Sequence, residues 1–137
     1  MTTSERTRLP VPRRPAEHHD ARVLVRDVGR WATVAQVYGE IDMRTTTTLH
    51  QRLDAALDSP DLLLLVLDLS EVDFLGASGL AMLVDLVEHA ARRAVGLRLV
   101  AAHRVVLRPL TLTGLLERFA VFPTETAAIA PYSEALR

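Results

Sequence analysis

The stretch LLLLVLDLSEVDFLGASGLAMLVDL, residues 62–86, decides the fold of this chain. Its first part, Leu62–Leu69, is apolar apart from Asp68, which is typical of a strand covered on both faces of a sheet. The next helix is expected to begin near Ser78, and its core stripe at helical spacing is Leu80, Leu83, Val84, Val87 and Ala91. A buried strand that turns directly into a helix is typical of an α/β fold with parallel strands.

Upstream of this stretch, the pattern predicts two strands and a helix. Residues 23–26 and 31–38 favour strands that pair as a hairpin, with Gly39 at the end of the second strand. Apolar residues at helical spacing predict a helix that begins within Thr45–Thr48, because threonine caps a helix better than it continues one, and ends at Ser59-Pro60.

Downstream, strands and helices continue to alternate. Leu97–Ala101 predicts a strand, and Val105–Thr113 predicts a weaker helix that contains Pro109. A short strand at Val121-Phe122 precedes a last helix, which Pro131 is expected to disrupt. The order β-β-α-β-α-β-α-β-α predicts a single α/β domain with a mixed, mostly parallel sheet and covering helices.

The composition limits the classes of function. The chain has 137 residues, 49% of them apolar, a formal net charge of -1 and no cysteine. We expect one domain at residues 21–137 and a disordered tail with proline and arginine at residues 1–20. A chain without cysteine has no disulfide scaffold, zinc-thiolate site or cysteine nucleophile, and His18-His19 alone make no closed metal site.

Neither a membrane nor a nucleic acid is an expected partner. The longest aliphatic run, Leu62–Leu67, is too short to cross a bilayer, and the N-terminus lacks the apolar stretch of a signal peptide. A net charge near zero argues against a basic nucleic-acid-binding face. We therefore expect a cytoplasmic protein without metal or cofactor.

Two strand ends carry the candidate site, because function in open α/β sheets collects beyond the carboxyl ends of the strands. One is Gly39–Asp42 and the other is Asp73–Gly79. Ser78 has two compatible interpretations: it caps the following helix, or its hydroxyl is accessible to a partner, because Gly76 and Gly79 flank it without side chains.

A small serine hydrolase is the enzymatic alternative. The string GASGL nearly matches the G-x-S-x-G nucleophile motif, but Leu80 replaces its last glycine. A triad also needs a histidine after the serine: His89 lies on the Ser78 helix three turns away, and His103 begins another crossover. The chain has no G-x-x-x-x-G-K motif and no lysine, so a nucleotide-binding enzyme fits no better.

Five further residues have a structural and a functional interpretation. Asp42 either caps the threonine-rich helix or acts in a switch, and both remain open. Asp68 and Asp73 flank the end of the central strand, where loop solvation or capping is favoured over catalysis. Phe74, like Trp31 earlier in the chain, is expected in the core rather than as a ligand-stacking residue.

Three segments of the chain resemble the STAS domain, and within it the stand-alone bacterial anti-sigma factor antagonists. The first contains GEID, residues 39–42, and its helix; the second is LVLDLSEVDFLGASGLAML, residues 65–83; the third ends in LTLTGLLERFAVF at Phe122. The second is the most specific, and together the three cover most of residues 23–130.

This resemblance implies a switch and not a catalyst. The unphosphorylated antagonist binds an anti-sigma factor, which is usually a serine/threonine kinase of the histidine-kinase-like ATPase type, and so frees a sigma factor in bacterial stress or sporulation signalling. The kinase phosphorylates a serine or threonine of the switch loop, the complex separates, and a phosphatase resets it. Ser78 takes the phosphorylated position, and Asp42 that of the family's acidic residue.

The switch loop departs from the family pattern at two positions. Gly76 stands where the family usually has Asp, and Ala77 where it has Ser or Thr. The switch-loop and partner-binding residues implied by the resemblance are Asp42, Leu75, Gly76, Ala77, Gly79 and Leu80. A phosphate on Ser78 would place a hydrated dianion on a partly apolar docking patch and weaken binding without refolding. The alternative is a STAS scaffold or small-anion-binding subunit of a signalling assembly.

Overall fold

The computed structural model describes residues 22–135, with side chains to residue 130. The tail expected at residues 1–20, with His18 and His19, lies outside the described residues. The elements are β1 (Arg22–Val28), β2 (Ala32–Ile41), α2 (Thr46–Leu57), β3 (Leu64–Leu75), α3 (Ala77–Arg92), β4 (Gly96–Val100), α4 (Arg104–Leu112), a 3₁₀ turn (Leu115–Arg118), β5 (Ala120–Phe122) and α5 (Glu125–Ala135).

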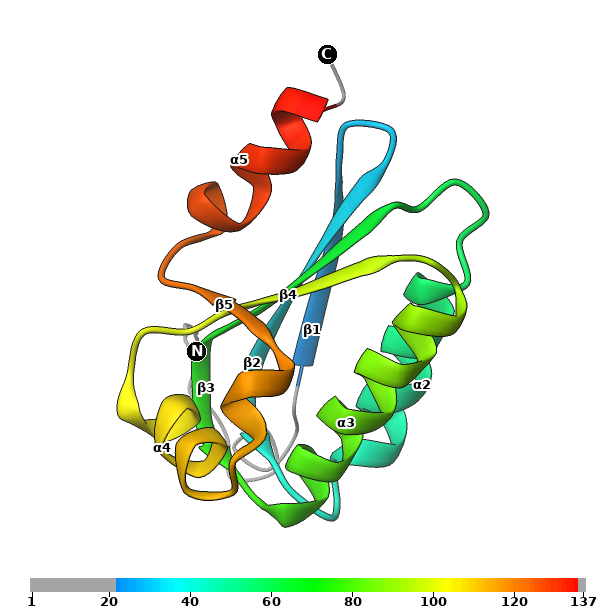
Figure 1. Ribbon diagram of the computed structural model, residues 1–137. Coiled ribbons are helices and arrows are strands. Elements are labelled where there is room, and N and C mark those ends of the chain that lie inside the picture. The colour runs from blue at the N-terminus through cyan, green and yellow to red at the C-terminus, as the bar shows by residue number, and fades with distance from the viewer. Residues whose placement is uncertain (1–21, 136–137) are drawn as a thin grey trace, which may run out of the picture.

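The five strands form one sheet in the order β1-β2-β3-β4-β5 (Figure 1). β1 and β2 are an antiparallel hairpin, and every later pairing is parallel, so the predicted mixed, mostly parallel α/β domain is confirmed. The predicted element order is also correct, apart from the short 3₁₀ turn that precedes β5.

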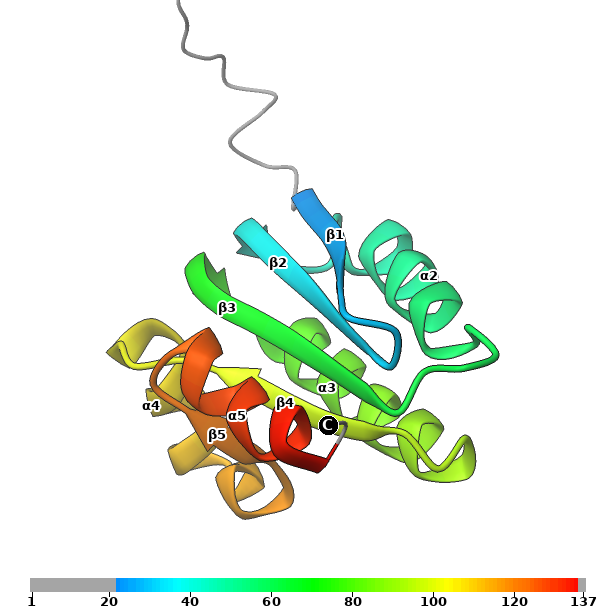
Figure 2. The same ribbon diagram turned by 90° about the horizontal axis from the view of Figure 1, so that it is seen from above.

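The helices cover the two faces of the sheet unequally. Helices α2, α3 and α4 pack on one face, where they bury the larger core cluster, and α5 packs on the other face, where Ala128 is buried (Figure 2). The central strand β3 is therefore buried on both faces over Leu64–Leu69, as its continuous apolar sequence predicts.

Strand β3 is longer than its sequence pattern indicates. It continues past Leu69 to Leu75 through further pairing with β2, and two irregularities in this pairing change which face its residues point to. Leu69, Val72 and Leu75 consequently all reach the same core cluster, although their spacing does not alternate as in a regular strand. β4 pairs only with Leu64–Asp68, so the last part of β3 has a strand neighbour on one side only.

Several local expectations were wrong. Gly39 does not end β2 but lies inside it at φ 92°, beside one of the irregular pairings, a conformation that glycine adopts without strain. Asp68 is not a loop residue but a buried strand residue. Helix α5 continues past Pro131, because a proline removes one helical hydrogen bond without having to end the helix.

Phe74 is not a core residue. Its side chain is 49% exposed, because the pairing irregularity before it turns the ring away from the core that Val72 and Leu75 enter. The ring instead lies beside Gly76, where a Cβ would meet its Cε2 atom at 2.9 Å.

Candidate functional site

The two loops singled out in the sequence meet at one end of the sheet (Figure 1). Ile41 and Leu75 are paired at the ends of the parallel strands β2 and β3, so the residues that follow them begin side by side. The backbone N–H of Gly76 donates a hydrogen bond of 3.0 Å to the carbonyl oxygen of Ile41 and ties the loops together. The two predicted loops therefore lie side by side at the carboxyl ends of parallel strands, where sites collect in open α/β sheets.

Ser78 is not the cap of α3 but the second residue of that helix, and Gly76 occupies the N-cap position. Its side chain is partly exposed, and within the described residues its hydroxyl has no hydrogen-bond partner. The free N–H groups of the first helical turn lie next to it, which favours negative charge at this position.

Ser78 lines a shallow depression of about 170 Å³ between the first halves of α2 and α3. The other residues that line it are Thr46, Thr47, His50, Ala81, Met82 and Asp85. None of these six was singled out in the sequence. The sequence pattern places these residues on two amphipathic helices. It does not show that the two helices lie side by side, because their arrangement depends on how they pack on the sheet.

Gly79 serves packing and not the exposure of Ser78. It is buried, and a Cβ built on it would lie 2.7 Å from both Ile41 Cγ2 and Leu75 Cδ1 and 3.2 Å from the Ile41 carbonyl oxygen. The missing side chain therefore lets α3 approach the ends of β2 and β3 closely.

Asp42 organises the turn that precedes α2. Its carboxylate accepts a hydrogen bond of 2.9 Å from the Arg44 backbone N–H, which holds the pKa of the Asp42 carboxyl below its usual value. Its carbonyl oxygen accepts bonds from the N–H groups of Thr45 and Thr46 at the start of the helix. Asp42 does not line the Ser78 depression; the carboxylate that does is Asp85.

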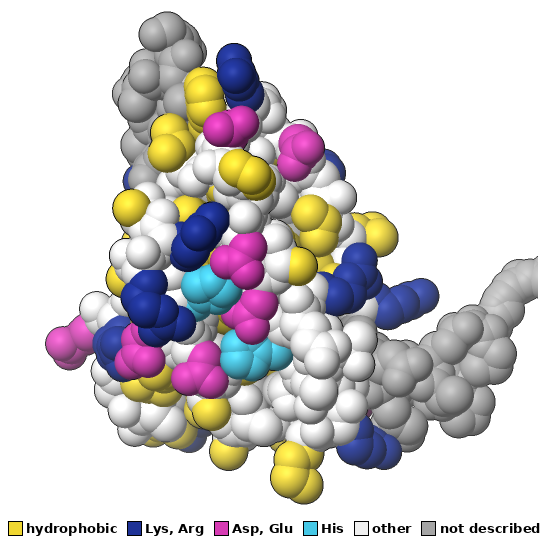
Figure 3. Space-filling model, turned by 90° about the vertical axis from the view of Figure 1, so that its right-hand side faces the viewer, with side chains coloured by type: hydrophobic (Ala, Val, Ile, Leu, Met, Phe, Trp, Pro, Cys, Tyr) yellow, Lys and Arg dark blue, Asp and Glu magenta, His cyan; other side chains and the backbone are white. Residues whose placement is uncertain are grey.

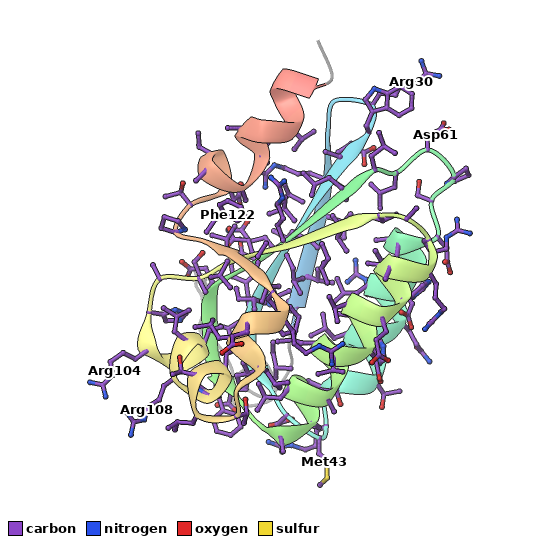
Figure 4. All side chains as sticks on the ribbon, in the orientation of Figure 1. Arg30, Met43, Asp61, Arg104, Arg108 and Phe122 are labelled. Atoms are coloured by element: carbon purple, nitrogen blue, oxygen red, sulfur yellow. The ribbon has the colours of Figure 1, made fainter. Side chains whose placement is uncertain are left out.

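The remaining predicted site residues divide into exposed and buried groups. Ala77 is exposed and Leu80 is partly buried, whereas Leu75 is buried like Gly79. Two large apolar side chains that were not assigned to the site lie at these strand ends: Met43 is 82% exposed and points away from the molecule (Figure 4), and Phe74, near the end of β3, is about half exposed. The surface offered at this end is thus partly apolar.

The histidines weighed for a hydrolase have other partners. The nitrogens of His89 lie 2.7 Å from Asp54 and 2.9 Å from Asp58, and His103 donates to the Val72 carbonyl oxygen at 3.0 Å. His50 does line the depression, but its described contact is with Asp54. Figure 3 shows histidine, acidic and arginine side chains together on the side of the molecule formed by α2 and α3.

The described residues form neither a metal-binding cluster nor a membrane-spanning helix. No group of three or more histidine, aspartate or glutamate side chains there is arranged to hold a metal ion. No helix of residues 22–135 has the length and apolar character needed to cross a bilayer.

Comparison with known proteins agrees on one family. The STAS domain model matches residues 24–128. The anti-sigma-F factor antagonist RsfA of Mycobacterium tuberculosis is 31% identical over 117 residues, which are 83% of this chain and 82% of that protein. RsfB of the same organism, also an anti-sigma-F factor antagonist, is 37% identical over 92 residues, 66% of this chain and 73% of that protein.

Solved structures give the same result. The crystal structure of an anti-sigma factor antagonist from Mycobacterium paratuberculosis has a TM-score of 0.72 and 35% identity, covering 81% of this chain and 92% of that one. Unphosphorylated SpoIIAA, at 15% identity, shares the fold with a TM-score of 0.69 over 82% of this chain and 97% of its own. Because the family match spans nearly all of the described domain and includes both strand-end loops, the chain belongs to the STAS domain family.

Proposed function

We propose that this chain is an anti-sigma factor antagonist. It binds its anti-sigma factor at the carboxyl ends of β2 and β3, on a surface that consists of Asp42, Met43, Phe74, Ala77 and Ser78. The curated relatives carry this function in their names, and the similarity to them extends over most of the chain. The partner is an anti-sigma factor of the histidine-kinase-like ATPase type, a phosphatase resets the switch, and the chain itself catalyses nothing.

The observation that carries the proposal is the hydroxyl of Ser78. It is partly exposed, has no hydrogen-bond partner in the described part of the chain, and lies in the first turn of α3, at the same end of the sheet as the exposed side chains of Met43 and Phe74. A kinase can reach such a hydroxyl without unfolding the domain. Its oxygen attacks the γ-phosphorus of ATP, the bond to the bridging oxygen breaks, the hydroxyl proton leaves, and ADP departs.

The phosphorylated form would keep the fold and lose the partner. A phosphate adds about -1.5 to -2 charges, which the first turn of α3 accommodates. The nearby Asp85 carboxylate makes the depression more negative still, and a partner that packs on Met43 and Phe74 would have to desolvate the dianion. Every loss of about 1.4 kcal/mol in binding energy is a tenfold loss of affinity.

A capture experiment tests the proposal. The tagged full chain, Ser78→Ala and Ser78→Asp are incubated with extract of the source cell, with and without ATP, and bound proteins and phosphorylated residues are identified by mass spectrometry. We expect the wild type to capture a histidine-kinase-like ATPase and to release it as Ser78 becomes phosphorylated. Ser78→Ala should stay bound in ATP, and Ser78→Asp should bind at least about tenfold more weakly.

Ser59→Asp is the matched control, because Ser59 is exposed and lies in the loop after α2, at the opposite end of that helix. It should bind as the wild type does. Phosphate on the domain of Ser78→Ala would contradict the assignment of the acceptor, and large homo-assemblies without an ATPase would favour a scaffold instead.

A further inference from the structure

Helix α4 presents a basic and apolar outer surface that folding does not explain. Its inward side chains, Val106 and Leu110, are fully buried in the core. The outward residues Arg104, Val105, Arg108 and Leu112, called the α4 face below, recur at helical spacing and are all exposed, Leu112 to 71%. Figure 4 shows Arg104 and Arg108 projecting together from this helix into solvent.

The two arginines of the α4 face have no ion-pair partner among the described residues. Some other arginines of the domain do have one: Arg26 pairs with Glu125, Arg93 with Asp58, and Arg118 with Glu88. Two guanidinium groups one helical turn apart, with an exposed leucine beyond them, suit an acidic segment that also carries an apolar side chain.

The α4 face lies next to the end of the sheet that carries the proposed docking site. His103, the N-cap residue of α4, donates a hydrogen bond of 3.0 Å to the carbonyl oxygen of Val72, which lies on the part of β3 that leads to Phe74. The two ribbon views, which differ by 90°, both place α4 beside this end of β3 (Figures 1 and 2). The start of α4 is thus fixed to the strand that presents the switch loop.

We propose that the α4 face is a second contact for the anti-sigma factor and binds an acidic, partly apolar segment of that partner. The inference rests on the proposed function and adds the chemistry of its partner. Charge alternates across the combined surface, because Asp85 lines the Ser78 depression whereas Arg104 and Arg108 project from α4. Such an alternation fixes the orientation of a docked partner.

Charge reversal tests the electrostatic part of this contact. The affinity of the captured anti-sigma factor for the full-length wild type, Arg104→Glu/Arg108→Glu and Arg30→Glu/Arg92→Glu is measured at about 50 mM and about 500 mM salt. The control changes the net charge equally at the opposite end of the molecule, where Arg30 lies in the β1–β2 turn (Figure 4). We expect the α4 double variant to bind at least about tenfold more weakly at low salt, and this difference to shrink at high salt. The control should stay within about twofold of the wild type.

Removal of the leucine tests the apolar part. Leu112→Ser should weaken binding at both salt concentrations, whereas Leu24→Ser, which changes a comparably exposed leucine on β1, should not. All variants alter exposed side chains, so equal unfolding midpoints are expected and would exclude misfolding as the cause.

The possible results separate this inference from the proposed function. If the α4 variants bind like their controls while Ser78→Asp binds weakly, the α4 contact is overturned and the proposed function stands. If no anti-sigma factor is captured, or Ser78→Asp binds it normally, both fail. Binding to phosphatidylglycerol vesicles is measured on the same variants. If Arg104→Glu/Arg108→Glu weakens vesicle binding but not binding of the anti-sigma factor, the α4 face contacts lipid and the α4 contact with the partner is overturned.

Discussion

At the scale of the residue, Gly79 decides how closely α3 approaches the sheet. Its neighbours Ile41 and Leu75 fill the space that a side chain would need, and one of the close atoms is a backbone oxygen, which cannot rotate away. A side chain at position 79 would therefore require the first turn of α3, which contains Ser78, or the strand ends to shift.

We predict that Gly79→Ala lowers the free energy of unfolding by about 1–3 kcal/mol, because the new methyl group overpacks the contact. Urea unfolding measures the change. Gly76→Ala is the control: its methyl group would meet mainly the ring of Phe74, which is half exposed and can move, so a loss below about 1 kcal/mol is expected. Equal losses in the two variants would contradict the packing role of Gly79.

Only some residues of the candidate site could be predicted from the sequence. Ser78 could be identified from the strand–turn–helix pattern and its likeness to a known motif. Asp85 and His50 could not, because they belong to the depression only through the packing of two helices that the chain separates by a strand. Phe74 was misplaced for a related reason: hydrophobicity predicts burial, but the pairing irregularity before it reverses the side on which the ring lies.

At the scale of the elements, α2 and α3 are joined by a histidine between two carboxylates. His89 of α3 faces Asp54 of α2 and Asp58, the C-cap residue of α2, with its two ring nitrogens, and both nitrogens can donate only when the ring is protonated. The hydrogen bond to Asp54 and the nearby negative charges raise the pKa of His89 above its usual value. Each carboxylate has a further partner: His50 contacts Asp54, and Arg93 contacts Asp58.

We predict that this contact makes stability depend on pH. Since the pKa of His89 is higher in the folded than in the unfolded chain, its stabilisation is complete below about pH 6.5 and is lost as the pH rises through the folded value. His89→Gln should therefore flatten the decline in stability between about pH 6 and pH 8, measured as unfolding midpoints across that range. His103→Gln serves as the control; a decline that persists unchanged in His89→Gln would refute the assignment.

The elements themselves were largely predictable because apolar periodicity is strong in most of them. The main exception is the second half of β3, SEVDFL, residues 70–75, which looks like a loop because its core residues do not alternate. A pairing irregularity is a property of two strands together, so a single strand's sequence does not reveal it.

At the scale of the whole molecule, the two faces of the sheet are covered differently: α2, α3 and α4 pack on one face and α5 on the other. Glu125 connects the first turn of α5 to the second face of the sheet. Its carboxyl group forms an ion pair with Arg26 and a hydrogen bond with the carboxyl group of Asp68. That bond raises the pKa of Glu125. Burial acts to raise the pKa of Asp68 as well, but hydrogen bonds from Glu125 and Ser70 hold it below its usual value.

We predict that Glu125→Ala lowers the free energy of unfolding by about 1–3 kcal/mol, because it removes a partner from the buried Asp68. Binding of the anti-sigma factor should be unchanged in the folded variant, since Glu125 lies away from the carboxyl end of β3. Denaturation and affinity measurements on one preparation would separate the two effects. If fully folded Glu125→Ala bound the anti-sigma factor more weakly than the wild type does, α5 would also contribute to binding.

The one-sided pairing of β3 has a dynamic consequence for the docking end. Beyond Asp68 the strand is held by β2, by core side chains and by the His103 hydrogen bond, but not by β4. Amide hydrogens of residues 70–75 are therefore expected to exchange with deuterium faster than those of residues 64–68, through local opening that leaves the rest of the sheet intact. This end of the sheet can thus open locally by itself, and a partner bound at the proposed docking site would appear as a slowing of exchange confined to residues 70–75.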